Sequence, residues 1–263
     1  MNSIDVIIFI EHLDREHETA LRLSRELRGR GYSVAVLSTF YHPHLLLKFR
    51  PKVVLCPYIL GANDWPISIV KKLYGEDVVY INQNWEQLLS ALNLEYKKPR
   101  AHFTSREVIQ LVWDKYFEDY LVECDVTPAN IYATGNPAND ILKEMQSDKQ
   151  VWRDKFSEEY GLDTNKEWLF LPLNYGWAFS LDSLIQAKVK KGYPEERAYQ
   201  YRDFSQKSLN EFAKFLSQLW TEGRYEIIMR PHPSIGPEDY TNYFKEQLDM
   251  DFPKVKVIKD YTI

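Results

Sequence analysis

Short apolar runs constrain the fold of this chain more than any other feature. Residues 4–10, 32–38, 52–58 and 77–83 each contain a short apolar run that is largely β-branched. A run of this length is typical of a strand that is buried on both faces of a parallel sheet. The segments between these runs have helical patterns. The alternation of strand and helix therefore predicts a doubly wound parallel sheet.

Two later segments extend this first unit. Residues 106–123 carry Val108, Leu111 and Phe117 near one helical face, which predicts an amphipathic helix. Residues 130–140 contain a short apolar run, a Gly turn and a Pro. They predict the last strand–helix unit of this part of the chain.

A charged stretch, residues 148–166, separates this pattern from a second one. It can form one surface helix that ends at Gly161. Beyond it, the pattern predicts helices over residues 181–221 and 237–248. Apolar runs predict three more strands, at residues 168–173, 225–230 and 254–260.

We therefore predict the α/β class with two Rossmann-like units. The first unit spans residues 1–148, a linker spans residues 149–166, and the second unit spans residues 167–263. A doubly wound unit usually has five or six strands. Because the second unit has only three predicted strands, we expect it to be truncated at the C-terminus, and a small second domain is the alternative.

The composition limits the kinds of partner and the compartment. Hydrophobic residues make up 44% of the chain and charged residues 27%, which is an ordinary globular composition. The net charge of −5 and the lack of a basic stripe disfavour a nucleic-acid partner. No apolar run approaches the ~20 residues that cross a bilayer, so any membrane association is expected to be peripheral. Cys56 and Cys124 match no metal or redox spacing, which fits a reducing cytoplasm.

Polar residues follow the predicted strands, at the edge where ligands bind in open α/β sheets. Glu11 and His12 follow the first strand, and Glu86 follows the fourth. Carboxylates and histidines can serve as the general base for a substrate hydroxyl, so we predict these three as catalytic residues. The alternative for Glu11 and His12 is a solvated helix start with acids in its first turn.

A second set of polar residues is predicted to line an acceptor site or cleft. It consists of Asn84 and Trp85 after the fourth strand and Asn136 in the Gly turn. Trp85 can stack on a sugar or a base, and packing in the core is the alternative. Residues 42–44, His-Pro-His, have no third ligand at a sensible spacing, so no metal site is predicted.

The second unit contains the run Arg-Pro-His-Pro-Ser at residues 230–234. Its prolines restrict their own φ and favour an extended chain before them, which holds His232 in one backbone pose. Arg230 offers a forked donor to phosphate oxygens. Together with Ser234, and with Asn174 after the preceding strand, these residues predict a site for a phosphate or diphosphate.

The helix that follows bears on the same prediction. Backbone N–H groups before Pro237 can hold a phosphate with the help of the helix dipole. Glu238 and Asp239 lie in the first turn of that helix and already complement the dipole. These two acids argue against the phosphate site, and a simple loop cap is the alternative.

Two motifs in the chain resemble a known family. Residues 123–142, ECDVTPANIYATGNPANDIL, resemble the acceptor-domain exit of bacterial surface-polysaccharide glycosyltransferases of the GT-B architecture. Residues 227–234, IIMRPHPS, resemble the Arg-Pro-His-Pro element of their second domain. That element also occurs in CDP-glycerol glycerophosphotransferases, and capsule Kdo- and sialyltransferases have a related His-Pro element. The order of elements is similar over most of the chain, but only these two motifs are sharp.

The resemblance implies an enzyme with one task for each unit. The first unit would bind a glycan or lipid-linked acceptor. The second would bind a nucleotide-sugar donor, with Arg230, His232 and Ser234 at the nucleotide phosphate. The implied reaction is sugar transfer in cell-surface polysaccharide or capsule synthesis, in the cytoplasm at the inner face of the membrane. No cofactor is expected, and no metal is required.

One departure from the family and three alternatives remain open. Beyond the third strand of the second unit, the family has a further helix and an acidic, Ser-rich donor loop, before which this chain ends. The first alternative is a glycerophosphotransferase that uses CDP-glycerol. The second is a non-catalytic scaffold, or a truncated fragment, with this fold. The third is a nucleotide-sugar epimerase, which would need acids and a histidine around the sugar, and the sequence identifies no such set.

Overall fold

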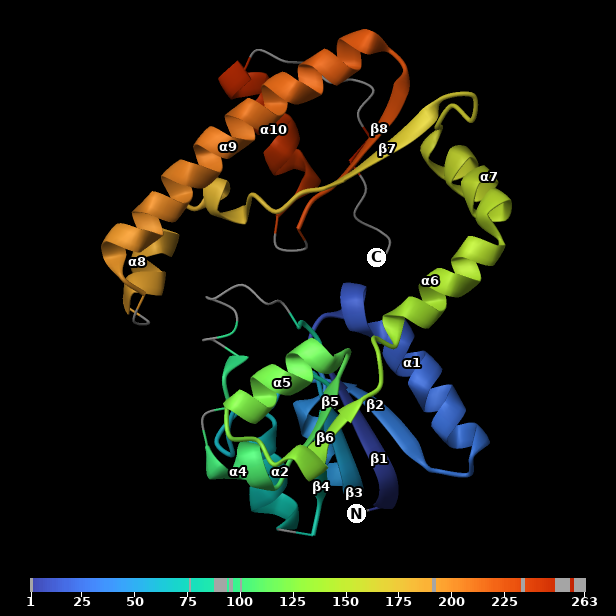
Figure 1. Ribbon diagram of the computed structural model, residues 1–263, viewed down its shortest axis with the longest axis vertical. Coiled ribbons are helices and arrows are strands. Elements are labelled where there is room, and N and C mark those ends of the chain that lie inside the picture. Colours follow the sequence, from blue (N-terminus) through green and yellow to red (C-terminus); the bar gives the residue numbers. More distant parts are fainter. Residues whose placement is uncertain are drawn as a thin grey trace. The chain divides into compact units, whose positions relative to one another are not determined.

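The chain folds into two compact units, Met1–Ser147 and Asp148–Ile263, and both are α/β (Figure 1). The predicted class, α/β with two Rossmann-like units, is confirmed. The predicted linker contains the helix α7 (Lys149–Tyr160), which belongs to the second unit. The computed structural model describes residues 2–75, 77–87, 94, 97–99, 101–190, 193–232, 235–248 and 256–257.

The first unit is built on a six-stranded sheet in the order β2-β1-β3-β4-β5-β6. Every neighbouring pair is parallel, and β1 pairs with β2 on one side and with β3 on the other. The order therefore reverses between β1 and β3. The strands are β1 (Asn2–Ile10), β2 (Val34–Ser38), β3 (Phe49–Cys56), β4 (Val79–Asn82), β5 (Ile109–Val112) and β6 (Ile131–Ala133).

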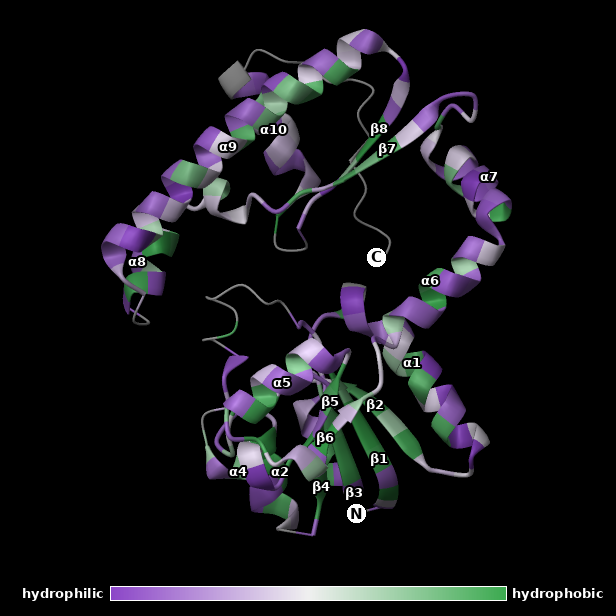
Figure 2. Cartoon of the chain, in the orientation of Figure 1, coloured by the Kyte–Doolittle hydropathy of each residue, from purple (hydrophilic) through white to green (hydrophobic). Residues whose placement is uncertain are grey.

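Helices cover both faces of this sheet. Successive side chains of a strand point to opposite faces, so neighbouring residues of β1 enter different cores. Ile8 packs in one core with Ala20 of α1, and Phe9 packs in another core with Val70 of α2. Figure 2 shows the central strands as the hydrophobic part of this unit. The helices are α1 (Leu13–Gly29), α2 (Ile67–Tyr74), α4 (His102–Arg106), α5 (Lys115–Glu123) and α6 (Ala138–Ser147), with the short 3-10 helices η1 (Pro43–Lys48) and η2 (Pro128–Asn130).

The prediction of one helix over residues 106–123 is wrong. This segment holds the end of α4, the strand β5 and the helix α5. The run Ile109–Val112 has β-branched residues at both ends and a fully buried Val112, which suits a central strand. Asp114 then begins a new helix, because its side chain accepts a hydrogen bond from the N–H of Phe117. Apolar residues of a strand and of a following helix therefore combine into one apparent helical pattern.

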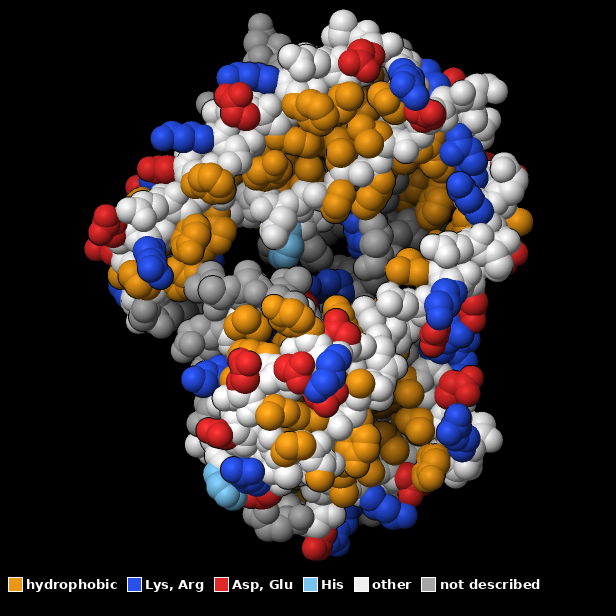
Figure 3. Space-filling model, in the orientation of Figure 1, with side chains coloured by type: hydrophobic (Ala, Val, Ile, Leu, Met, Phe, Trp, Pro, Cys, Tyr) orange, Lys and Arg blue, Asp and Glu red, His pale blue; other side chains and the backbone are white. Residues whose placement is uncertain are grey.

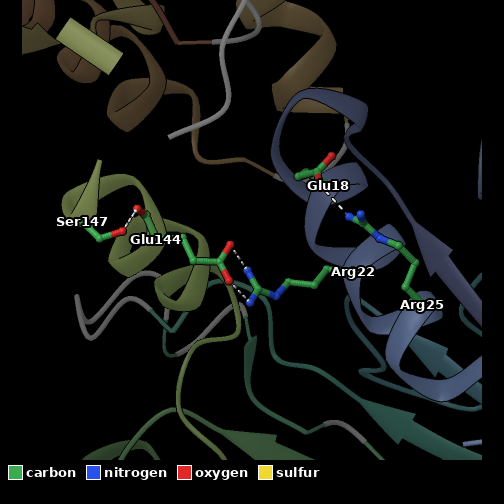
Figure 4. Close-up of polar contacts among 5 residues, drawn as sticks. All are labelled: Glu18, Arg22, Arg25, Glu144 and Ser147. Carbon is green, nitrogen blue, oxygen red and sulfur yellow. Dashed lines mark hydrogen bonds and ion pairs between the residues drawn. The ribbon is translucent and has the colours of Figure 1, made fainter. Parts of the chain in front are cut away.

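An ion pair joins α6 to α1 (Figure 4). Nη1 of Arg22 donates to Oε2 of Glu144 at 2.9 Å, and Nη2 donates to the other carboxylate oxygen. On α1 itself, Arg25 donates to Glu18 at 3.1 Å. The Arg22–Glu144 pair lies in water, so we expect it to orient α6 more than to stabilise the fold.

The second unit has a three-stranded parallel sheet in the order β7-β8-β9. Leu209 and Leu216 of α9 pack against Ile227 and Met229 of β8, and Tyr240 of α10 joins the same core. The elements are β7 (Glu167–Pro172), the 3-10 helix η3 (Gly176–Phe179), α8 (Asp182–Lys190), α9 (Glu195–Glu222), β8 (Tyr225–Arg230), α10 (Pro237–Leu248) and β9 (Lys256–Val257).

Two details of this unit bear on the prediction. The predicted helix over residues 181–221 is divided into α8 and α9, and Pro194 is the N-cap of α9. Proline restricts the residue before it to extended conformations, which accounts for a break here. The predicted helix 237–248 is confirmed as α10. Of the predicted strand 254–260, only β9 lies within the described residues.

Hydrophobic side chains also gather on the surface of the second unit, in the region of α9 and β7 (Figure 3). Phe204 and Phe215 of α9 and Phe170 of β7 are exposed. Exposed apolar residues are ordinary on protein surfaces, so these three residues do not define a site. Within the described part of the chain, no helix combines the length and the apolar character that crossing a membrane requires.

Candidate functional site

A pocket of about 470 Å³ opens in the first unit at the carboxyl ends of β1, β2, β3 and β4. This is the place where the strand order reverses, between β1 and β3. Open α/β sheets bind ligands at such a switch point, because the connections leave it in opposite directions and open a crevice. Residues from the four strand exits line the pocket, among them Glu11, His12, Thr39, Phe40, Tyr58 and Glu86.

Glu86 lies in this pocket between two cations. Arg15 donates from Nη1 to Oε1 of Glu86, and Nζ of Lys97 lies 3.5 Å from Oε2. Burial raises the pKa of Glu86, but the positive charges of Arg15 and Lys97 outweigh it and lower the pKa overall. Glu86 is therefore held as a carboxylate, which accepts hydrogen bonds well but is a weak general base.

Lys97 is the more buried of the two cations. Its side chain is only 10% exposed, and its Nζ lies 3.2 Å from the ring centroid of Tyr58. Burial lowers the pKa of Lys97, and the charge of Glu86 opposes this effect. The face of Tyr58 and the carboxylate of Glu86 together compensate a charge that burial disfavours.

Glu16, in the first turn of α1, is the other unusual acid of this region. It is 2% exposed, and its Oε2 accepts a hydrogen bond from the N–H of Glu11 at 2.6 Å. Among the described residues, its Oε1 has no hydrogen-bond partner. Burial raises the pKa of Glu16 from 4.5 to about 7, and the nearby charge of Glu11 acts in the same direction. Glu16 thus fixes the backbone of a pocket residue while its own proton exchanges near neutral pH.

The structure brings the three predicted catalytic residues together. Glu11 and His12 lie at the end of β1, and Glu86 lies after β4, so one pocket holds all three. His12 also forms the N-cap of α1, with its backbone oxygen accepting from the N–H of Glu16 at 2.9 Å. Arg15 and Lys97 were not among the predicted residues. Arg15 lies four residues after Glu11, about one helical turn, so the sequence could have placed it near the pocket. Nothing in the sequence indicates that Lys97 lies there.

The two predicted acceptor residues after β4 have other surroundings. The side chain of Asn84 is buried and donates to Oε1 of Gln110 at 3.0 Å, and it also accepts from Asn82 at 3.0 Å. Its φ of 46° suits asparagine, which tolerates the left-handed region. Trp85 is half-buried, its backbone N–H donates to the backbone oxygen of Pro57 at 3.1 Å, and its side chain does not line the pocket. These residues form the turn that carries Glu86.

Replacement of Asn84 by Ala is expected to destabilise the first unit by about 1–3 kcal/mol, because buried amide groups lose their partners. Thermal or urea unfolding measures this cost. Asn174→Ala, at an exposed position, is the control and should change stability by less than about 0.5 kcal/mol. Equal stability of the Asn84 variant and the parent would show that the amide network is not needed.

Two further sequence features have local structural partners. Oδ1 of Asn136 accepts from the N–H of Ala138 at 3.0 Å, so this predicted acceptor residue begins α6. In the His-Pro-His run, Nδ1 of His42 accepts from the N–H of Ser38 at 3.0 Å. Neither side chain lines the pocket of the first unit.

In the second unit, the predicted donor residues gather at one edge of the sheet. Pro172 of β7 lies opposite Arg230 of β8, so the exits of these parallel strands are adjacent. Asn174 follows the first of them and is exposed, whereas Arg230 and His232 are half-buried. The fourth predicted donor residue, Ser234, lies outside the described residues.

The start of α10 differs from the expectation of free backbone N–H groups. The N–H of Gly236 donates to Oδ2 of Asp239 at 2.9 Å, and the carboxylate of Glu238 lies against Gly236. The acids of the first turn therefore occupy the positive end of this helix. A phosphate at the Gly236 N–H would have to displace them, which leaves Arg230 and His232 as the main candidates for holding one.

Comparisons with known proteins show the fold. No protein-family model matches the chain, and no curated protein sequence matches it. The structure of UDP-N-acetylglucosamine 2-epimerase from Rickettsia bellii is similar, with a TM-score of 0.53 and 11% identity over 100% of this chain and 70% of that one. A glycosyltransferase from Rickettsia africae ESF-5 gives a TM-score of 0.47 and 11% identity over 99% of this chain and 69% of that one. The first likeness establishes a GT-B-like fold for this chain.

Proposed function

We propose that the protein is a glycosyltransferase that moves a sugar from a nucleotide-sugar donor to a glycan or lipid-linked acceptor in cell-surface polysaccharide synthesis. One observation carries the proposal: a pocket at the switch point of the first sheet gathers Glu11, His12 and Glu86. Acids and a histidine that converge in one pocket are the groups that acid–base chemistry on a hydroxyl requires. The two motifs that resemble surface-polysaccharide glycosyltransferases, and the GT-B-like fold, support the same reading.

The proposal assigns acceptor activation to the first unit. His12 takes the proton of the acceptor hydroxyl as the acceptor oxygen forms its bond to the anomeric carbon of the donor sugar. The bond from that carbon to the donor phosphate breaks, and its electron pair leaves with the nucleotide. Glu86, held ionised by Arg15 and Lys97, contributes charge and hydrogen bonding rather than proton uptake.

The proposal assigns the donor phosphate to the second unit. Arg230 and His232 lie at the carboxyl edge of β7 and β8, where ligands of such sheets bind. Their donors stabilise the negative charge that grows on the leaving phosphate. These protein groups supply the positive charge, so the proposal needs neither a cofactor nor a metal. It places the protein in the cytoplasm, with peripheral association at the inner membrane face where a lipid-linked acceptor is presented.

A nucleotide-sugar epimerase is the second candidate. It requires acids and a histidine around a sugar, and the pocket of the first unit holds Glu11, His12, Asp64 and Glu86. The fold likeness to an epimerase fits this candidate as well, although at 11% identity it bears on the fold alone. A CDP-glycerol glycerophosphotransferase would use a similar donor site. The nucleotide that binds distinguishes it from a nucleotide-sugar transferase.

Calorimetric titration with CMP, CDP, UDP and GDP tests the donor site. We expect one nucleotide to bind the parent. We expect His232→Ala to lower the affinity for that nucleotide at least tenfold, which is ~1.4 kcal/mol of binding free energy. His17→Ala, at an exposed position on α1 outside the pocket, is the matched control and should bind as the parent does. If no nucleotide binds at millimolar concentration, the transferase proposal fails and the non-catalytic alternative gains support.

A further inference from the structure

Two aromatic side chains stand at the rim of the pocket in the first unit. Trp65 is 42% exposed and Phe40 is 60% exposed, and both line the pocket. Large apolar side chains that remain exposed around a concave polar site are typical of ligand contacts. Tyr58 also lines the pocket, but its ring face is covered by Lys97, and Trp85 does not line it.

The ring of Trp65 is held in place. Its Nε1–H donates to the backbone oxygen of Thr39 at 3.0 Å, which ties the segment after β3 to the loop after β2. Thr39 is itself buried and donates its N–H to the oxygen of Ile10 at 2.9 Å. The turn before Trp65 is closed by Asp64, which accepts from the N–H of Leu60 at 3.0 Å. A ring fixed in this way loses little conformational entropy when a ligand stacks on it.

The charged groups of the pocket decide between kinds of ligand. Glu11, Asp64 and Glu86 provide three carboxylates, whereas Arg15 and Lys97 provide two cations that are already directed at Glu86. This balance disfavours the diphosphate of a nucleotide, which brings further negative charge. It suits a neutral ring with many hydroxyl groups, because carboxylates accept and guanidinium and ammonium groups donate hydrogen bonds.

We propose that this pocket binds one sugar ring of the acceptor, with its C–H face stacked on Trp65 and its hydroxyl groups bonded to Glu86 and Arg15. This inference rests on the proposed transferase function and adds the subsite and its ligand class. Trp65 supplies a flat apolar surface of fixed orientation, and the Arg15–Glu86 pair supplies donors and an acceptor together. The donor nucleotide binds elsewhere, at the residues of the second unit.

Ligand-observed NMR tests the sugar site with free glucose, galactose, N-acetylglucosamine, rhamnose and glucuronic acid as probes. We expect saturation transfer from the parent to at least one neutral sugar, and a fall of roughly tenfold in affinity in Trp65→Ala, ~1.4 kcal/mol. Trp65→Phe keeps an aromatic face and should retain part of the binding. Tyr132→Ala removes another exposed aromatic residue of the same unit, one that does not line the pocket, and this variant should bind sugars as the parent does.

Nucleotide titration of the same samples separates the two proposals. If Trp65→Ala weakens sugar binding and leaves nucleotide binding unchanged, the inference stands. If a nucleotide binds but no sugar does, the sugar site is refuted and the donor proposal survives. The same conclusion follows if a nucleotide binds and the parent and Trp65→Ala bind sugars equally well. If Trp65→Ala weakens the nucleotide instead, the pocket holds the donor and the inference is overturned. Thermal unfolding of each variant, with Trp65→Phe as the milder change, excludes misfolding as the cause.

Discussion

A Glu16→Gln variant is expected to be more stable than the parent above pH 7, by about 3 kcal/mol. The reason is that Glu16 is buried and 2% exposed, which raises its pKa from 4.5 to about 7. Gln has nearly the same shape, and its side-chain oxygen can accept the N–H of Glu11 as the carboxylate does. The variant therefore keeps the hydrogen bond and avoids burying a negative charge.

The sign of the pH dependence follows from proton binding. Between pH 4.5 and pH 7 the folded protein retains the proton of Glu16 that the unfolded chain has released. The stability contributed by protonated Glu16 is complete below pH 4.5 and is lost as the pH rises through 7. Parent and variant should therefore have similar stability near pH 4 and diverge above it.

Urea unfolding from pH 4 to pH 8 measures this divergence. Glu18→Gln is the matched control, because Glu18 lies on the same helix, is exposed and pairs with Arg25. The free energy of unfolding of Glu18→Gln should stay close to that of the parent from pH 4 to pH 8. A Glu16 variant whose stability relative to the parent does not change with pH would contradict a raised pKa at this residue.

A His12→Ala variant is expected to lower kcat for sugar transfer by about 10²–10⁴-fold, the usual contribution of a general base. His12 lines the pocket at the exit of β1, whereas Glu86 is held ionised by two cations. The loss should fall mainly on kcat and less on KM, because the proton moves in the transition state. Initial rates over a range of acceptor concentrations separate the two constants.

His17→Ala is the control for this experiment as well, since it removes an exposed imidazole from α1, the helix that His12 caps. We expect it to retain the activity of the parent. If His12→Ala were as active as the parent, proton uptake would belong to another group. Glu11→Gln would then be the next variant, because Glu11 lines the same pocket.

Much of the fold could be predicted because buried parallel strands have continuous apolar runs. Residues 6–10 and 227–229 are such runs, and they lie in β1 and β8. The strand β5 could not be recognised in the same way. Only two residues separate Val112 from the start of α5, so the strand and the helix give one continuous pattern. The pairing of Asn82 with Gln110, which puts β5 beside β4, depends on contacts between distant residues.

The pocket could be predicted in part for a similar reason. Strand exits meet at one edge of a parallel sheet, so Glu11, His12 and Glu86 could be placed together from the order of elements. Which other residues line the pocket depends on the conformation of the loops. Trp65 reaches the rim, while Trp85 does not line the pocket, and a sequence pattern does not distinguish the two. Glu16 has the sequence context of a solvated acid, and only the fold shows that it is buried.

The most direct test of the transferase proposal is to incubate the protein with UDP-, GDP- and CMP-activated sugars and CDP-glycerol, with and without a saccharide acceptor. Nucleotide release and product mass are measured together. We expect release that depends on the acceptor, an acceptor heavier by one sugar residue, and a large loss of both in His12→Ala. A product that carries glycerophosphate would favour the glycerophosphotransferase, and an isomer of the donor with unchanged mass would favour the epimerase. Transfer of no sugar from any donor would contradict the proposal.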